Sequence, residues 1–291
     1  MTKPATNPQP HIEHCDGLSQ IVDKYDGLLL DVWGVLHNGE APYPGVIDCL
    51  AKLKAAGKDT LLFSNAPRRP HQLQEQLTRL GITRDMYGQA ITSGEVTHQW
   101  LKKHHHAGKK YYFLGVPAKD SSLYDDLEQA VFVDSMQDAD LNVASNFLED
   151  RSDLAAYTDE FSDAIAAKVP MACANPDIIV NKGDKTLNCS GMLAQHYAEL
   201  GGDVTYFGKP YAAIYDYAQT LLPGKKLLAI GDSLATDIKG ATSNGIDAAL
   251  VATGIHAADF SDSGMKFEES LNKLSMIKGV WPKYFLPSLR W

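Results

Sequence analysis

Short apolar runs alternate with amphipathic segments along most of the chain. Each apolar run has the length of a buried strand, and the clearest are 27–30, 60–63, 227–230 and 248–251. Segments with helical spacing lie between these runs and close at glycines or polar turns, as at 46–56, 68–80 and 212–221. Alternating strands and helices predict a parallel sheet that is covered on both faces. The expected fold class is α/β, with a doubly wound parallel sheet.

The same alternation of apolar runs and amphipathic segments begins again near Lys110 and indicates a second lobe. Further strands are expected at 111–115, 141–144 and 171–174, with helices at 153–167 and 192–200. Shorter helical pieces are expected at 18–24 and 122–128. A chain of 291 residues has room for two modest cores. We therefore expect two lobes, each built from strands and helices.

The charge balance limits the partners that suit this chain. Lysine and arginine number 27 against 36 aspartates and glutamates, so the formal net charge is −9. This charge disfavours nucleic acid and anionic membranes as partners, and no apolar segment is long enough to span a bilayer. The four cysteines show no metal-ligand spacing and are typical of reduced thiols. A cytoplasmic protein is the expectation.

Polar residues stand where several of the predicted strands end. In chain order these groups are Asp31, Ser64-Asn65, Gly208-Lys209-Pro210 and Gly231-Asp232. In open α/β sheets the carboxyl ends of the strands border one ligand crevice, so the groups are expected to meet. Carboxylates such as Asp31 and Asp232 suit Mg²⁺, while a serine hydroxyl, a backbone N–H and a lysine suit phosphoryl oxygens. The combination predicts a site for Mg²⁺-dependent phosphoryl transfer, in which one carboxylate attacks phosphorus.

The order of these motifs resembles that of the haloacid dehalogenase superfamily of aspartyl-phosphate phosphohydrolases. The chain carries DxxGV from Asp31, then Ser-Asn, then Gly-Lys-Pro, and finally GDxxxxD from Gly231 to Asp237. The stretches TSGE at 92–95, ANPD at 174–177 and the segment 189–210 further resemble the NagD-like subfamily. The resemblance implies a Rossmann-like core over residues 1–91 and 206–291, with an inserted α/β cap domain over 92–205.

The resemblance also implies roles for individual residues. The catalytic set is Asp31, as the nucleophile, with Lys209 and Asp237. The implied Mg²⁺ ligands are the side chains of Asp31 and Asp232 and the main-chain carbonyl of Trp33. The implied phosphate-binding residues are Ser64, Asn65 and Lys209. In the cap, Asn175 and Asp177 either line the substrate face or form an Asn-Pro-Asp turn.

Trp33 is where the chain departs from the family pattern. Phosphatases of the superfamily usually have a second aspartate there, which protonates the leaving oxygen and later activates water. An indole exchanges no proton near neutral pH, and general acid–base help is typically worth about two to four orders of magnitude in rate. Metal binding survives because only a main-chain carbonyl is needed. His37 is either a replacement acid or a solvent-exposed loop histidine, and we favour the exposed loop.

The expected activity is Mg²⁺-dependent hydrolysis of a small phosphorylated metabolite, such as a sugar or nucleotide phosphate, through an aspartyl-phosphate intermediate. The alternative is a phosphate-ligand binding or regulatory protein, or a phosphotransferase, in which Trp33 has impaired hydrolysis. Cap loops decide the substrate in such proteins, so the sequence does not name it. A homodimer through the cap is a further expectation from the resemblance.

Overall fold

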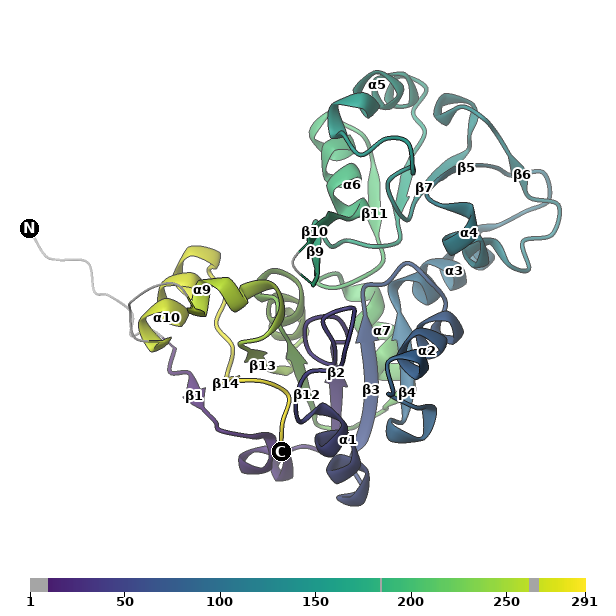
Figure 1. Ribbon diagram of the computed structural model, residues 1–291. Helices are drawn as coiled ribbons and strands as arrows, with labels where there is room; N and C mark the ends of the chain where they lie inside the picture. Colours follow the sequence, from purple (N-terminus) through teal and green to yellow (C-terminus); the bar gives the residue numbers. More distant parts are fainter. Residues whose placement is uncertain (1–9, 184, 262–266) are drawn as a thin grey trace, which may run out of the picture.

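Two parallel sheets organise the chain, and Figure 1 shows them as two lobes. The structure is a computed structural model that describes residues 10–183, 185–261 and 267–291. The predicted α/β fold, with a doubly wound parallel sheet and a second α/β lobe, is confirmed. Among the helices in the described part of the chain, none combines the length and the apolar character needed to cross a membrane.

The larger sheet has seven strands in the order β1-β14-β13-β12-β2-β3-β4. These strands are β1 (Glu13–His14), β2 (Gly27–Leu30), β3 (Asp59–Ser64), β4 (Gln89–Thr92), β12 (Leu227–Gly231), β13 (Asp247–Val251) and β14 (Tyr284–Leu286). Leu30 of β2 pairs with Ile230 of β12 on one side and with Leu62 of β3 on the other. The residues after these three positions leave the sheet at the same edge, so Asp31 emerges between the ends of β12 and β3.

Helices cover both faces of this sheet. They are α1 (Val46–Ala55), α2 (Pro70–Arg79), α3 (Ser93–His104), α7 (Ala212–Leu221), α8 (Lys239–Ser243), α9 (Ala257–Ser261) and α10 (Phe267–Lys278). Short helical turns complete the lobe: η1 (Leu18–Gln20), η2 (Val22–Lys24), η3 (Arg84–Met86), η7 (Leu234–Ile238) and η8 (Gly254–His256). The single helix predicted over 18–24 is wrong, because the backbone at Ile21, with φ −128°, leaves the helical region between η1 and η2.

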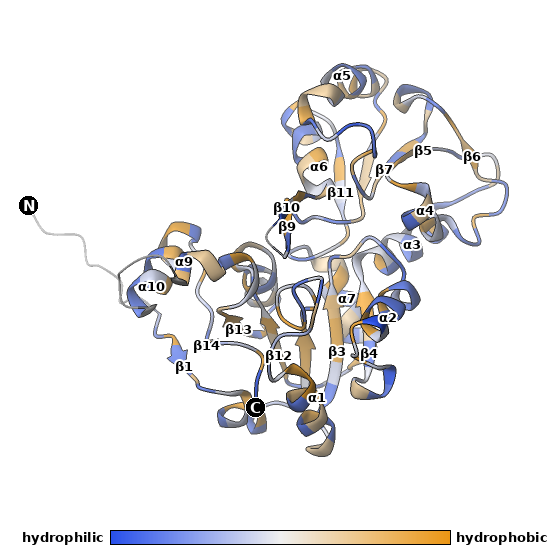
Figure 2. Cartoon of the chain, viewed as in Figure 1, coloured by the Kyte–Doolittle hydropathy of each residue, from blue (hydrophilic) through white to orange (hydrophobic). Residues whose placement is uncertain are grey.

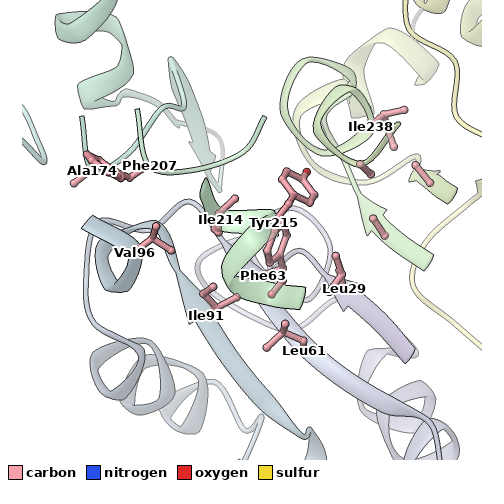
Figure 3. Close-up of a cluster of buried hydrophobic side chains, with 14 of the residues drawn as sticks. Leu29, Leu61, Phe63, Ile91, Val96, Ala174, Phe207, Ile214, Tyr215 and Ile238 are labelled. Atoms are coloured by element: carbon pink, nitrogen blue, oxygen red, sulfur yellow. The ribbon is translucent and has the colours of Figure 1, made fainter. Parts of the chain in front are cut away.

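Alternate residues of the central strands face opposite helical layers, which explains why these strands read as uninterrupted apolar runs. Leu28 and Leu30 belong to the cluster that includes α1 and α2. Leu29 belongs to the cluster on the other face, with α3 and α7. Figure 3 shows this second cluster, in which the rings of Phe63 and Tyr215 lie 5.0 Å apart between centroids. Figure 2 shows the same strands as an apolar interior between more polar helices.

The smaller sheet has five strands in the order β11-β8-β7-β5-β6. The strands are β5 (Lys110–Leu114), β6 (Val131–Phe132), β7 (Leu141–Ala144), β8 (Met171–Cys173) and β11 (Val204–Tyr206). Its helices and turns are α4 (Pro117–Asp120), η4 (Ser121–Tyr124), η5 (Met136–Asp138), η6 (Leu154–Tyr157), α5 (Thr158–Ala166) and α6 (Ser190–Glu199). The helix predicted over 122–128 is wrong, because η4 ends early and Asp126 and Gln129 take positive φ. The chain boundaries predicted for the cap, 92 and 205, stay a prediction.

A separate hairpin lies where the two lobes face each other (Figure 1). Strand β9 (Ile179–Lys182) pairs antiparallel with β10 (Lys185–Asn188), and the two form a sheet of their own. The strand predictions above did not include this hairpin. Its position matters because it brings part of the smaller lobe, called the cap below, toward the end of β2.

Candidate active site

Three buried side chains form an ion-pair set at the carboxyl edge of the larger sheet. Asp31 follows β2, Lys209 precedes α7, and Asp237 lies in η7. Lys209 Nζ donates to Asp31 Oδ1 at 2.6 Å and to Asp237 Oδ1 at 2.7 Å. Burial alone would lower the pKa of Lys209, but the carboxylates of Asp237 and Asp31 raise it above its ordinary value. The ammonium group therefore stays charged beside the predicted nucleophile.

Asp232 adds a third carboxylate, and the resulting set fits a divalent cation. One carboxylate oxygen from each of Asp31, Asp232 and Asp237 lies within 4.8 Å of the others, and all three residues are buried. Burial raises the pKa of Asp31 to about 7 and the pKa of Asp232 well above its ordinary value, and repulsion from neighbouring carboxylates adds to both shifts. Three carboxylates thus face one ammonium group. Hard oxygen donors with this excess of negative charge suit Mg²⁺.

Two glycines allow Asp232 to reach this position. Gly34 and Gly254 have positive φ, at 90° and 78°, and a Cβ on either would overlap the Asp232 carboxylate. Asp232 Oδ2 also accepts the Ile255 N–H at 2.6 Å. The carboxylate is therefore held between two loops whose backbone only glycine adopts easily. Gly34, the glycine of the DxxGV motif, is therefore needed because a side chain there would clash with Asp232, and not because of Asp31.

Asn65 connects the predicted phosphate-binding residues to the cap. Its Oδ1 accepts the Lys209 N–H at 2.7 Å, and its Nδ2 donates to the Lys209 carbonyl at 3.0 Å and to Asp177 Oδ1 at 2.8 Å. Ser64, at the end of β3, is buried, and its Oγ accepts the Ala66 N–H at 3.2 Å. The side-chain amide of Asn65 is engaged on both atoms. Its side chain therefore holds Lys209 in place, and contact of Ser64, Asn65 and Lys209 with phosphate stays a prediction.

Trp33 turns its indole toward the cap. Its Nε1–H donates to the main-chain oxygen of Asn181 in β9 at 2.5 Å. The ring also lies against Gly39, where a Cβ would come 2.5 Å from Trp33 Cζ2, and meets the His37 ring edge-to-face at 5.1 Å between centroids. The Trp33 carbonyl lies two residues after Asp31, which is compatible with a contact to Mg²⁺. This contact stays a prediction.

The expectation of a solvent-exposed His37 is wrong, because the residue is fully buried under the Trp33 ring. Its Nδ1 accepts the Gly39 N–H at 2.9 Å, which places the single proton of the neutral ring on Nε2. Burial lowers the pKa of His37 to about 4. The ring is therefore neutral at pH 7, and the structure gives no support to His37 as the replacement acid.

Asn175 and Asp177 form a turn, and Asp177 also contacts the larger lobe. The Asp177 N–H donates to Asn175 Oδ1 at 3.1 Å, as in an Asx turn. Asp177 Oδ1 meets Asn65, as described above, and burial raises the pKa of Asp177 to about 6 while Lys209 opposes that shift. The turn and the contact of Asp177 with the larger lobe thus occur together. Contact of either residue with substrate stays a prediction.

Sequence reasoning missed the loop and hairpin that close the site around Trp33. The Gly183 N–H donates to the Asn38 carbonyl at 3.2 Å, next to the bond between Trp33 and Asn181. One signal for the hairpin was available, since a Gly-Asp pair at 183–184 separates two short segments with β-forming residues. No comparable signal marks the partner of Trp33, because its indole N–H bonds to a main-chain carbonyl, which any residue could provide.

This arrangement defines a class of protein. A doubly wound sheet carries a buried lysine and three carboxylates at its carboxyl edge, and a second α/β lobe faces that edge. Ligands bind at this edge in open α/β folds. The chain is an α/β enzyme of the phosphoryl-transfer type.

The family follows from comparison with known proteins. Residues 28–127 match the family model described as haloacid dehalogenase-like hydrolase, and residues 206–289 match a second model described as HAD-hydrolase-like. The two matches together span more than half of the sequence. The chain belongs to the haloacid dehalogenase-like hydrolases, and the predicted membership is confirmed.

Relatives of the chain agree with this family over most of its length. A 4-nitrophenylphosphatase from Schizosaccharomyces pombe is 28% identical over 298 residues, which cover 93% of this chain and 94% of that protein. The crystal structure of a haloacid dehalogenase-like hydrolase from Brucella suis 1330 is 29% identical, with a TM-score of 0.80, and the match covers 94% of this chain and 99% of that chain. Glycerol phosphate phosphatase from Mycobacterium tuberculosis, solved in complex with magnesium, shares the fold at 24% identity and a TM-score of 0.65, covering 84% and 73%.

Proposed function

We propose that the protein is a Mg²⁺-dependent phosphohydrolase of a small phosphorylated metabolite, and that Trp33 slows its hydrolytic turnover. The observation that carries this proposal is the contact between Lys209 Nζ and Asp31 Oδ1, with Asp232 and Asp237 beside it. An isolated buried carboxyl group would retain its proton near pH 7, whereas one paired with a lysine and a cation is ionised and nucleophilic. The similarity to a 4-nitrophenylphosphatase supports the reaction class.

The residues around Asp31 have complementary roles in this proposal. Asp31, Asp232 and the Trp33 carbonyl would hold Mg²⁺, which when bound neutralises charge on the phosphoryl oxygens. Asp237 orients Lys209 through Oδ1, and its own Oδ2 accepts the Ser233 N–H at 3.1 Å. The charged Lys209 then lies beside the transferring group and stabilises it electrostatically.

The proposed reaction has two steps, and in each step one bond to phosphorus forms while another breaks. First, an Asp31 carboxylate oxygen bonds to phosphorus while the bond to the leaving oxygen breaks. Water then attacks the same phosphorus, releases phosphate and restores the Asp31 carboxylate. The leaving oxygen needs a proton in the first step, and the attacking water loses one in the second. The Trp33 indole serves neither transfer, and the neutral, buried His37 does not replace it.

A series of phosphate esters with different leaving groups tests this proposal. Without a proton donor, cleavage depends on how well the leaving oxygen carries negative charge. In the first turnover, we expect acetyl and 4-nitrophenyl phosphate to release their leaving groups about 10²–10⁴-fold faster than alkyl sugar phosphates. Phospho-Asp31 should accumulate in acid-quenched samples of the fast-reacting esters, measured by mass spectrometry. A first-turnover rate that is independent of leaving-group pKa would show that another acid acts, and no leaving-group or phosphate release from any ester would favour a phosphate-binding protein.

The control for this series is the pair Trp33→Asp and Trp33→Phe. Trp33→Asp restores a carboxyl group and should raise alkyl phosphate turnover selectively, whereas Trp33→Phe removes the indole without adding an acid. Truncation of a packed tryptophan can cost about 3–5 kcal/mol, so the Tm of both variants is measured alongside the rates. Equal alkyl phosphate rates in the two folded variants would contradict the proposed role of position 33.

A phosphotransferase would share the first step and pass phosphate from Asp31 to an acceptor other than water. The same assay separates the two activities, because only hydrolysis releases inorganic phosphate in the absence of an acceptor. Assembly into a homodimer through the cap also stays a prediction, and the sedimentation coefficient of the full chain tests it.

A further inference from the structure

The β9–β10 hairpin has little support from its own lobe. Within the described residues, its strands pair with each other and not with the five-stranded sheet. All four residues of β10 are exposed, and so are both ends of β9. An isolated two-stranded hairpin is marginally stable in water. Contacts with the larger lobe therefore decide where this hairpin lies.

Strand β9 lies close to η8 of the larger lobe, and two hydrogen bonds that run in opposite directions fix the hairpin to the loop after β2. The Trp33 Nε1–H of the larger lobe donates to the Asn181 carbonyl at 2.5 Å. The Gly183 N–H of the hairpin donates to the Asn38 carbonyl at 3.2 Å. Lys182, between the two hairpin positions, lies over the same loop, since a Cβ on Gly39 would come 3.1 Å from Lys182 Cγ.

Residues of the larger lobe itself pack around the Trp33 ring. Gly39, with φ of 92°, offers a surface without a side chain to one edge of the indole. The buried His37 ring packs edge-to-face on Trp33, and its Nδ1 accepts the Gly39 N–H. A side chain fixed in this way loses little further entropy when it forms its hydrogen bond.

We propose that Trp33 is a positioning residue whose indole N–H fastens the β9–β10 hairpin to the loop 33–43 beside Asp31. An aspartate at this position could not do so, because an ionised carboxylate has no hydrogen to donate to a carbonyl. The fastened hairpin covers one side of the Asp31 site and limits the access of water to it. This last consequence rests on the proposed function, whereas the fastening itself does not.

Hydrogen–deuterium exchange on the full chain, without substrate or metal, tests the fastening. Trp33→Phe keeps most of the ring and removes the N–H. We expect amides in peptides covering 179–188 to exchange roughly five-fold faster, the factor that loss of one ordinary hydrogen bond gives. Trp100→Phe is the matched control: Trp100 lies in α3 and packs on His104 and Phe207, so exchange in the hairpin should not change.

Unchanged exchange in 179–188 with Trp33→Phe would overturn the proposal and leave the proposed phosphatase activity untouched. Exchange in β3 is read in the same experiment, and faster exchange there would indicate general loosening. In that case Gly39→Ala provides the second test, since its methyl group displaces the indole and should again release the hairpin. With 4-nitrophenyl phosphate, Trp33→Phe should raise KM several-fold more than it changes kcat, a split that a purely structural loss would not produce.

Discussion

The carboxyl edge of the larger sheet pairs one lysine with two buried carboxylates, whereas the hairpin that faces it is held by hydrogen bonds at its own main-chain atoms. Lys209 bonds to both Asp31 and Asp237, and all three side chains are at least nine-tenths buried. In the hairpin, β10 is wholly exposed, and the main chain of Asn181 and Gly183 bonds to the larger lobe.

Under the proposed function, the buried edge carries out the chemistry and the hairpin side of the site admits the substrate. Charges that must act on phosphorus need a rigid and dry setting, since a small displacement or added water weakens electrostatic stabilisation. Groups that admit a substrate must move, and such groups are few in buried contacts. Asn65 lies where the two regions join, because it binds both Lys209 and Asp177. Substitutions in the two regions should therefore differ in kind and in size.

The largest effect is expected from Asp31→Asn. The amide is isosteric with the carboxylate but is a poor nucleophile, so hydrolysis of 4-nitrophenyl phosphate should fall at least about a thousand-fold. Asp48→Asn is the control, because Asp48 is an exposed residue of α1 that forms a salt bridge with Lys52, far in sequence from the residues of the site. If Asp31→Asn retained most of the activity, the covalent mechanism would be excluded. The buried edge would then no longer differ from the hairpin in its chemical role.

Asp232→Asn should change metal binding and stability. Burial, together with repulsion from Asp31 and Asp237, raises the pKa of Asp232 well above its ordinary value, so without a metal this carboxyl group opposes folding at pH 7, which lies above the ordinary pKa of an aspartate. The variant should therefore have a higher Tm than the wild type in EDTA. Mg²⁺ at about 100 times its Kd should raise the Tm of the wild type by roughly 5 °C and that of the variant by much less. An equal Mg²⁺ shift in both proteins, measured by calorimetry, would place the metal elsewhere.

The two regions also differ in how much the sequence predicts. Strands β2 and β12 are uninterrupted apolar runs and β3 is apolar over 61–63, and their register at Leu30 brings Asp31, Ser64 and Asp232 to one edge. The grouping of these residues at one edge can be predicted from the apolar pattern and the strand order. The position of Lys209 near Asp31 can be predicted in the same way. The hairpin does not, because its strands are short, exposed and without apolar periodicity.

The burial of His37 is a second feature that could not be predicted from the sequence. A histidine after Gly34-Val35-Leu36 in a turn-rich segment has the local features of an exposed loop residue. Its burial results from the Trp33 ring above it and from the Gly39 N–H that its Nδ1 accepts. Both partners belong to the same loop, but only its three-dimensional path brings them together. Tertiary packing therefore decided a property that local sequence could not.

The smallest effect is expected where the two regions join, at Asp177. Asp177→Ala removes the acceptor of the Asn65 Nδ2–H, so Asn65 should hold Lys209 less firmly and KM for 4-nitrophenyl phosphate should rise about five-fold. Asp177→Asn retains a carbonyl acceptor and should stay near the wild-type KM, which separates the hydrogen bond from the charge. If both variants raise KM equally, the carboxylate itself matters and Asp177 contacts the substrate directly. The cap would then contribute chemistry rather than positioning, and the contrast between a reactive edge and a selective cap would no longer hold.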